Sequence, residues 1–196
     1  MGKIIYIMGK SSTGKDTIYK RLLQDGSLHL KSIVGYTTRP IRHQESNGVE
    51  YFFTDEDGFA ALYQEGKVIE HREYHTMHGL WRYFTVDDGQ MDLRTGNYIT
   101  IGTIESYIHT KAYFGEENIL PVLIELDDGE RLMRALDRER RQENPKYEEM
   151  CRRFLADSED FSEEKIKEAG ITKRFLNDDL ERCIREITAY IGQNLL

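Results

Sequence analysis

A stretch of nine residues near the N-terminus has the spacing of a phosphate-binding loop. It reads "GKSSTGKDT" and places a glycine, four residues, a second glycine and Lys15 in the order typical of such loops. Successive backbone N–H groups can line an anion site there, the next helix adds the positive end of its dipole, and Lys15 adds a mobile charge. The sequence therefore predicts a nucleoside triphosphate site lined by Gly9, Ser11, Ser12, Thr13, Gly14, Lys15, Asp16 and Thr17.

Asp16 is the unusual residue of this loop, because it stands where the pattern has a hydroxyl residue and Thr17 follows one place late. A carboxylate in the first turn of a helix is favoured by the helix dipole, so its simplest role is to stabilise the helix start. The alternative, which we rank second, is a Mg²⁺ site formed by Asp16 and Thr17, directly or through water. Repulsion of the nucleotide is a third possibility, against which the presence of Lys15 and Thr17 argues.

A second cluster of phosphate-binding residue types lies in "YTTRPIRHQESNGVEYFF", residues 36–53. Arg39 and Arg42 offer planar, bidentate donors suited to a phosphate, and Tyr51 adds a hydroxyl. Glu45 either orients one of the two arginines or caps a turn. The cluster predicts a site for a second phosphorylated molecule.

The hydrophobic patterns predict the elements that must position these two clusters. Short apolar runs of the kind buried in parallel sheets predict strands at residues 4–8, 98–101, 120–126 and 175–176. Pro121 indicates that its strand begins there or lies at an edge for its first residues. Helical patterns are expected after the loop and at residues 59–63, 104–113, 129–143, 147–161 and 178–191. Residues 34–88 read as short antiparallel strands with turns, and the alternation elsewhere predicts an α/β fold.

Length and composition limit the classes of protein that fit. A chain of 196 residues suits one compact domain, and its net charge of −8 is a poor match for non-specific nucleic-acid binding. The two cysteines are far apart, which fits a reducing cytosol, and the N-terminal apolar run is too short for a secretory signal. We therefore expect a cytoplasmic protein with no membrane partner.

The second cluster resembles a signature of the guanylate kinase family, Thr-Thr-Arg-x-Pro-Arg-x-Gly-Glu-x-x-Gly-x-x-Tyr-x-Phe. Here the string occupies residues 37–53, with the proline one place earlier and Gln44 in place of the glycine. The resemblance covers essentially the whole chain. It implies that Glu70 accepts hydrogen bonds from the guanine base and that Tyr83 touches the acceptor phosphate. The residues it implies for acceptor binding are Arg39, Arg42, Tyr51, Glu70 and Tyr83.

The resemblance also implies a set of arginines in a mobile lid. Arg134 and Arg138 match an Arg-x-x-x-Arg pattern of the lid, and Arg153 matches a later lid arginine, with Arg152 as its competitor. Asn177 lies in a stretch that resembles the adenine pocket. The residues expected to act in catalysis are Lys15, Arg39, Arg134, Arg138 and Arg153.

The fold implied by the resemblance is a three-layer P-loop kinase fold of the α/β class. It has a central parallel sheet, an inserted mixed β subdomain that binds the acceptor, and a helical lid. The expected division of the single domain 1–196 is a core of residues 1–34, 94–128 and 156–196, an acceptor-binding subdomain of residues 35–93, and a lid of residues 129–155.

Two positions depart from the family where the acceptor base is read. Gly35 stands where the family usually has a serine, and the segment around Ile104 lacks the Asp-x-Asp pattern that follows the third core strand. Because lost polar partners lower the discrimination between bases, the specificity for the base is an open question at Gly35 and Ile104.

The activity implied by the resemblance is ATP-dependent phosphoryl transfer to a nucleoside monophosphate, with GMP or dGMP as acceptor and Mg²⁺ as the metal. Two alternatives stay open: a kinase for another nucleotide or a sugar phosphate, and a non-catalytic binding module of the same fold. The expected partners are small nucleotides, and the expected state is a monomer or a homodimer. A metal site at His71, His75 and His78 ranks below surface or substrate-side roles for these histidines.

Overall fold

The central sheet of the computed structural model is parallel throughout and carries the loop at the carboxyl end of its middle strand. The structure describes residues 1–43, 45–76 and 79–195. Within those ranges the sheet has five strands in the order β2-β7-β1-β8-β9. They are β1 (Ile4–Met8), β2 (Leu30–Ser32), β7 (Asn97–Ile101), β8 (Ile119–Glu125) and β9 (Arg174–Leu176). Every residue of β1 is buried, as its unbroken apolar run predicts.

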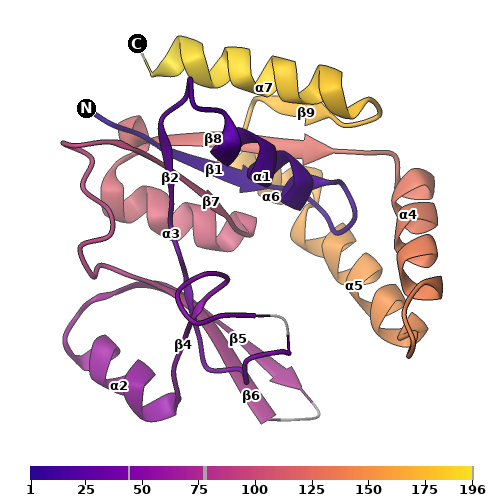
Figure 1. Cartoon of the computed structure of the whole chain (residues 1–196), viewed down its shortest axis with the longest axis horizontal. Coiled ribbons are helices and arrows are strands. Elements are labelled where there is room, and N and C mark those ends of the chain that lie inside the picture. Colours follow the sequence, from indigo (N-terminus) through magenta and orange to yellow (C-terminus); the bar gives the residue numbers. More distant parts are fainter. Residues whose placement is uncertain (44, 77–78, 196) are drawn as a thin grey trace.

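Helices cover both faces of this sheet (Figure 1). On one face α1 (Lys15–Gln24) and α7 (Leu180–Asn194) pack against the odd-numbered residues of β1. On the other face α3 (Ile104–Phe114) and α6 (Glu163–Glu168) pack against its even-numbered residues. A short 3-10 helix, η1 (Glu116–Asn118), leads into β8. The predicted three-layer α/β arrangement is therefore confirmed.

Pro121 lies inside β8, which begins two residues earlier than predicted, at Ile119. Strand β1 pairs with β8 from its first residue, whereas β9 joins only from Leu123 onward. The strand thus has a neighbour on one side alone at Pro121, where a missing N–H donor leaves the ladder intact. The edge position predicted from this proline is confirmed.

A second, mixed sheet is formed by the segment between β2 and β7. In the order β4-β3-β6-β5, its strands are β3 (Tyr36–Thr37), β4 (Phe52–Phe53), β5 (Val68–Thr76) and β6 (Gly79–Val86). Pairs β3–β6 and β5–β6 are antiparallel, but β3 and β4 are parallel. The inserted mixed β sheet implied by the resemblance is therefore confirmed. The antiparallel strands read from the residue pattern are present in two of the pairs, whereas the β3–β4 pair is parallel.

Aromatic packing fixes this sheet to α2 (Glu56–Gln64), which includes the helix predicted at residues 59–63. The ring of Phe59 packs edge-on against that of Phe84, with 4.9 Å between centroids. Asp55 caps the helix by accepting a hydrogen bond from the backbone N–H of Gly58. The small apolar centre that results holds the long β5–β6 hairpin in a fixed position.

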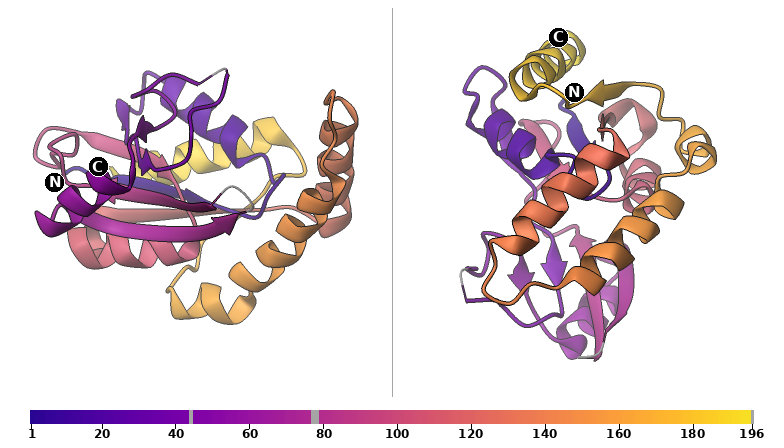
Figure 2. Two further views of the ribbon diagram at one scale, coloured as in Figure 1. Left: turned by 90° about the horizontal axis from the view of Figure 1, so that it is seen from below. Right: turned by 90° about the vertical axis from the view of Figure 1, so that its right-hand side faces the viewer.

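Two further helices, α4 (Asp128–Arg140) and α5 (Tyr147–Asp160), stand together at one side of the molecule (Figures 1 and 2). Helix α4 ends three residues before the predicted position, and "NP" at residues 144–145 lies in the connection. Asp127 caps α4 through the backbone N–H groups of Gly129 and Glu130. Among the described helices, none has the length and apolar character that a membrane crossing requires.

Candidate active site

The phosphate-binding loop lies between β1 and α1, in the strand–loop–helix order that the sequence predicts. Both of its glycines are required by close contacts. A Cβ at Gly9 would stand 2.5 Å from the carbonyl oxygen of Ile124, and one at Gly14 would stand 2.4 Å from Nδ2 of Asn177. Gly14 has a left-handed backbone with φ of 90°, and α1 begins at the next residue. Ser12 shares the left-handed region with φ of 64°, which is uncommon for a residue with a Cβ.

Lys15 opens α1 and has a half-buried side chain. In the part of the chain that the structure describes, its ammonium has neither a hydrogen-bond nor an ion-pair partner. Asp16 and Thr17 are exposed in the same turn, and their side-chain oxygens are likewise free of protein partners in the described ranges. The charge of Lys15 is therefore available to a phosphate, and the two oxygens are of the hard type that Mg²⁺ prefers.

Asn177 closes the loop from the far end of the chain. Its side-chain amide donates to the carbonyl oxygen of Thr13 at 2.6 Å, while its own Oδ1 is buried without a hydrogen-bond partner. Arg134 donates to the backbone oxygen of Asn177 at 3.3 Å, so α4 touches the same corner. The buried free oxygen is an acceptor that a bound base with an amino group can satisfy.

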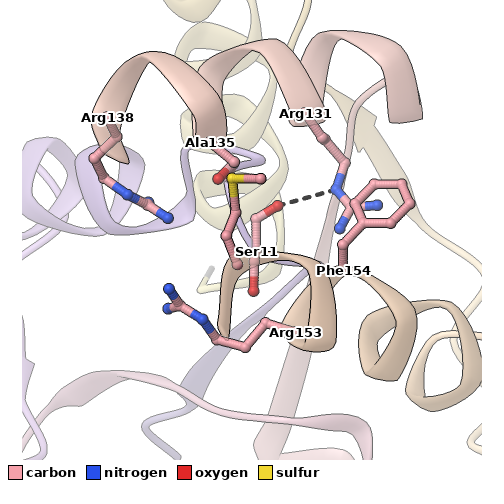
Figure 3. A pocket seen from close by; sticks show the side chains of 8 residues that line it. Ser11, Arg131, Ala135, Arg138, Arg153 and Phe154 are labelled. Carbon is pink, nitrogen blue, oxygen red and sulfur yellow. Dashed lines mark hydrogen bonds between the residues drawn. The ribbon is translucent and has the colours of Figure 1, made fainter. Parts of the chain in front are cut away.

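Arg138 and Arg153 approach the loop from α4 and α5 (Figure 3). Together with Ser11 and Ser12 they line one small cavity, in which Arg138 points inward from α4 and Arg153 from α5. Arg153 also lies 3.5 Å from Glu149 and 3.9 Å from Glu139, contacts that hold it in the absence of an anion. The structure thus brings the predicted lid arginines 138 and 153 to the loop.

Arg39 forms the best-defined ion pair of the second cluster. Its terminal nitrogens donate to both carboxylate oxygens of Glu45, at 2.7 and 2.6 Å, and its side chain is 3% exposed. The guanidinium also stacks over the rings of Tyr51 and Phe53, with centroids 5.3 Å away. The bond from Arg39 lowers the pKa of Glu45 to about 2, and the backbone N–H of Arg42 adds to the effect. Glu45 therefore orients Arg39, one of the two roles left open by the sequence.

The remaining acceptor residues share one face of the β5–β6 hairpin. Glu70 on β5 accepts from the hydroxyl of Thr85 on β6 at 2.7 Å, and Tyr83 stands two residues before Thr85 on the same face. The ring of Tyr83 packs edge-on against Tyr51, with 5.5 Å between centroids. The hairpin face therefore adjoins Arg39 through Tyr51, and Arg42 is exposed nearby in the preceding connection.

Part of the chain is similar in sequence to known guanylate kinases. The family model of guanylate kinase matches residues 1–81. A guanylate kinase of Mycoplasma capricolum is 33% identical over 124 residues, which are 63% of this chain and 40% of that protein. A guanylate kinase of Malacoplasma penetrans is 40% identical over 73 residues, or 37% of each chain.

Residues 1–81 of the chain are therefore similar to the guanylate kinase family.

A crystal structure of guanylate kinase from Anaplasma phagocytophilum extends the likeness in fold beyond the region of sequence similarity. It aligns with a TM-score of 0.67 and 19% identity, over 100% of this chain and 87% of that one. The sequence matches span less than half the length of the two curated guanylate kinases. The range matched by the family model, residues 1–81, includes both the phosphate loop and the second cluster.

Sequence reasoning missed two residues that contact the phosphate-binding loop, Arg131 and Asp157. The guanidinium of Arg131 is 1% exposed, donates to the backbone oxygen of Ser11 at 3.0 Å and to Asp157 at 2.7 Å, and lies over the ring of Phe154. The same carboxylate oxygen of Asp157 accepts from the backbone N–H of Ser11 at 2.7 Å. Sequence reasoning gave Arg131 no role, and only its four-residue spacing to Ala135 and Glu139, both buried, marks its inward face.

The two positions expected from the resemblance to lie beside the acceptor base, Gly35 and Ile104, differ in burial. Gly35 has room for a small side chain, since an added Cβ would meet only ordinary contacts at 3.5 Å and beyond. Ile104 is buried in the first turn of α3, which Thr103 and Ser106 cap reciprocally. Tyr6 fills the space beside it and donates to Ser106 at 2.8 Å, and burial raises the pKa of Tyr6 to about 12. An apolar and hydroxyl-lined wall thus replaces the carboxylates expected there.

The structure describes two of the three histidines that the sequence analysis considered as metal ligands. His71 and His75 lie on the strand β5, where His71 packs against the ring of Phe59 at 5.4 Å between centroids, and His78 lies outside the described residues. Of the residues with described positions, no group of three or more His, Cys, Asp or Glu side chains could hold a metal ion.

Proposed function

We propose that this protein is a nucleoside-monophosphate kinase that transfers the γ-phosphoryl group of ATP to GMP or dGMP. The observation that carries the proposal is the Lys15 ammonium, which stands without a partner among the described residues at the N-terminus of α1. Arg138 and Arg153 line the adjoining cavity with loop residues, as a site for a polyanion requires. The names of the matched relatives agree with this activity.

On the donor side, the loop amides and Lys15 would bind the β- and γ-phosphates, and Asn177 would lie beside the adenine base. The charge that spreads over the transferred phosphoryl group is then stabilised by Arg134, Arg138 and Arg153 as the lid closes. Closure of α4 and α5 over the loop would exclude water, which suppresses hydrolysis of ATP.

On the acceptor side, Arg39, Arg42, Tyr51 and Tyr83 would hold the phosphate of the monophosphate while Glu70 accepts from its base. An oxygen of this phosphate attacks the γ-phosphorus as the bond between that phosphorus and the β–γ bridging oxygen breaks, which yields ADP and a nucleoside diphosphate. The attacking oxygen is already anionic, so no general base is required. The protein therefore contributes position and positive charge.

The free oxygens of Asp16 and Thr17 fit a hard divalent cation, and we propose these residues as the protein's contribution to Mg²⁺ binding. When bound, Mg²⁺ supplies charge neutralisation across the β- and γ-phosphates. The helix-start role of Asp16 is compatible with this one, since the carboxylate lies in the first turn of α1.

A panel of phosphorylated acceptors with ATP and Mg²⁺, read by ADP release, tests the proposal. We expect GMP and dGMP to be clearly preferred over AMP, CMP, UMP and hexose phosphates. If another nucleotide or a sugar phosphate is preferred, the enzyme is a kinase of a different acceptor class. If no acceptor is turned over and calorimetry detects no binding of ATP–Mg²⁺, the chain is a non-catalytic binding module.

We further propose that the protein works in the cytoplasm with small nucleotides as its partners, as a monomer or a homodimer. Cys151 is exposed and Cys183 buried, and both thiols are free, which suits a reducing compartment. Light scattering of the purified protein, with and without nucleotides, measures the oligomeric state directly.

A further inference from the structure

Arg72 is a charged residue of the hairpin face to which the function proposed above gives no role. It lies on β5 two residues after Glu70, so both side chains leave the same face of the strand. Its partner across the hairpin is Tyr83, and that of Glu70 is Thr85. Arg72 therefore stands between the residue proposed to accept from the base and the tyrosine proposed to hold the acceptor phosphate.

The hydrogen bonds of this pair leave donors free. Nε of Arg72 donates to Oε2 of Glu70 at 3.2 Å, while the other carboxylate oxygen is taken by Thr85. Over the residues that the structure describes, the two terminal nitrogens of Arg72 have no hydrogen-bond partner. The side chain of Glu70 is 1% exposed and that of Arg72 18%, so the guanidinium is the more accessible member of the pair.

The surroundings hold Arg72 in its charged form. Burial disfavours the charge, yet Glu70 and the hydroxyl groups of Tyr6, Tyr74 and Tyr51 raise the pKa of Arg72 above its ordinary value. Tyr6 belongs to β1 of the central sheet, Glu70 and Tyr74 belong to β5, and Tyr51 comes directly before β4. A charged guanidinium with free terminal donors thus lies among a carboxylate and three tyrosine hydroxyl groups.

The pair offers an acceptor and a set of donors side by side, which is the complement of one purine. Guanine presents the N1–H and 2-amino donors next to its O6 acceptor, with N7 beyond it, and a guanidinium suits O6 and N7 in particular. Adenine presents an amino group where guanine has O6 and would leave Arg72 facing another donor. Neither Gly35 nor Ile104 has a polar side chain that could read O6 in its place.

We propose that Arg72 is a specificity-determining residue of the acceptor site, whose terminal nitrogens donate to O6 of guanine while Glu70 accepts from N1–H and the 2-amino group. This assignment rests on the proposed kinase function and names how that site selects its base. The phosphate of the acceptor is left to Arg39 and Arg42, which lie in the other segment of the site.

Two analogues of GMP test the contacts to the 2-amino group and to O6 of guanine separately. IMP lacks the 2-amino group and keeps O6, whereas 6-thio-GMP keeps both donors and replaces O6 with a sulfur, a weak acceptor. In the unaltered enzyme we expect kcat/KM for GMP to exceed that for 6-thio-GMP by roughly 5- to 100-fold, the usual range for a bidentate base contact. In Arg72→Met, whose side chain keeps most of the stem, that ratio should fall to within about twofold of unity. The ratio of GMP to IMP should stay as it is in the unaltered enzyme.

Two further variants keep the result interpretable. Arg72→Lys retains the charge without the fork, so its ratio of GMP to 6-thio-GMP should fall between the other two. Arg42→Met is the matched control, because it removes an arginine proposed to bind phosphate and should lower kcat/KM for all three acceptors without changing either ratio. Thermal unfolding and ATP binding, measured on each variant, show whether the fold and the donor site are intact.

Each outcome bears on a different claim. If Arg72→Met lowers both ratios, Arg72 only orients Glu70, and the assignment is overturned. If it lowers kcat/KM equally for all acceptors, as Arg42→Met does, Arg72 binds phosphate, and the assignment is also overturned. If Arg72→Met cannot be folded, the ratio in Arg72→Lys decides alone. If the unaltered enzyme phosphorylates none of the three acceptors, it is the proposed kinase function that fails.

Discussion

The proposed donor and acceptor halves of the site differ in how they are built. The donor half is a continuous loop of backbone groups between β1 and α1, and Lys15 stands in it without a protein partner among the described residues. The acceptor half is assembled from side chains on three strands and one connection, and its main cation, Arg39, is already bound to Glu45. The lysine of the donor half is free, whereas the arginine at the centre of the acceptor half is paired.

This difference predicts whether a substitution in each half lowers activity alone or also lowers the stability of the fold. A free ammonium adds nothing to the stability of the fold, so its removal should affect activity alone. A buried ion pair leaves an uncompensated charge when one partner is removed, so its loss should affect stability as well as binding. Substitutions in the two halves should therefore separate activity from stability in opposite ways.

The largest expected effect is that of Lys15→Ala on turnover. We expect a loss of at least about 10³-fold, because the lysine stabilises charge that develops on the transferred phosphoryl group. The midpoint of urea unfolding should stay unchanged. Lys20→Ala, on an exposed position of the same helix, is the control and should retain activity. Near-normal ADP release by Lys15→Ala would overturn the assignment of the donor site.

Arg39→Met, in contrast to Lys15→Ala, should lower the stability of the fold as well as the binding of the acceptor. We expect the free energy of unfolding to fall by about 3 kcal/mol, because Glu45 is left without its buried partner, together with a rise in KM for the acceptor. Arg42→Met, at an exposed position, should raise KM while changing stability by less than about 0.5 kcal/mol. Urea titrations of the two variants, measured side by side, compare their free energies of unfolding. Equal values would show that the ion pair of Arg39 with Glu45 does not stabilise the fold.

The same pair should make the acceptor half sensitive to acid. Because the folded pKa of Glu45, about 2, lies below its ordinary value of 4.5, the unfolded chain takes up the proton first. The stabilisation is therefore complete above pH 4.5 and is lost as the pH falls toward 2. Glu45→Gln should remove this part of the pH dependence, as measured by urea unfolding at several pH values. An unchanged acid profile in the variant would contradict the assignment.

Substitution of Asp157 tests whether its negative charge lowers the affinity of the donor half for ATP. Since its oxygen lies 2.7 Å from the loop N–H of Ser11, Asp157→Asn removes a negative charge beside the phosphate site. We expect ATP to bind roughly fivefold more tightly in calorimetry, which corresponds to about 1 kcal/mol. Asp160→Asn removes the same charge from the end of the same helix and should leave the affinity unchanged. Weaker binding in Asp157→Asn would mean that the carboxylate instead supports the loop.

The smallest effect concerns the strain within the loop. Ser12 has φ of 64° and a buried hydroxyl without a partner, so Ser12→Gly should stabilise the fold by up to about 1 kcal/mol. That gain corresponds to a rise of roughly 2–4 °C in Tm for a chain of this length. Ser11→Gly, next to it and outside the left-handed region, should lower Tm instead. Lower melting temperatures in both variants would show that the loss of the serine hydroxyl outweighs the relief of backbone strain.

Sequence reasoning succeeded where function depends on neighbours along the chain. The phosphate loop, the strand before it and the helix after it follow from a few consecutive residues, and so does the pairing partner available to Arg39 at Glu45. It failed where neighbours come from register or from distant helices. The position of Arg72 beside Tyr83 requires the exact alignment of β5 with β6, and the contact of Arg131 with Ser11 joins residues 120 positions apart. The parallel pairing of β3 with β4 was missed for the same reason, since it depends on the path of a long connection.

The bond from Asn177 to Thr13 has a consequence for how the protein is made. It spans 164 positions, and β1 has no strand to pair with until β7 has been synthesised. At about 5–20 residues per second, the first strand leaves the ribosome on the order of 5–20 s before its partner exists. Ile4, Ile5 and Ile7, all buried in the finished fold, are exposed on the nascent chain during that interval. The nucleotide site is thus among the first segments to be translated and among the last to take shape.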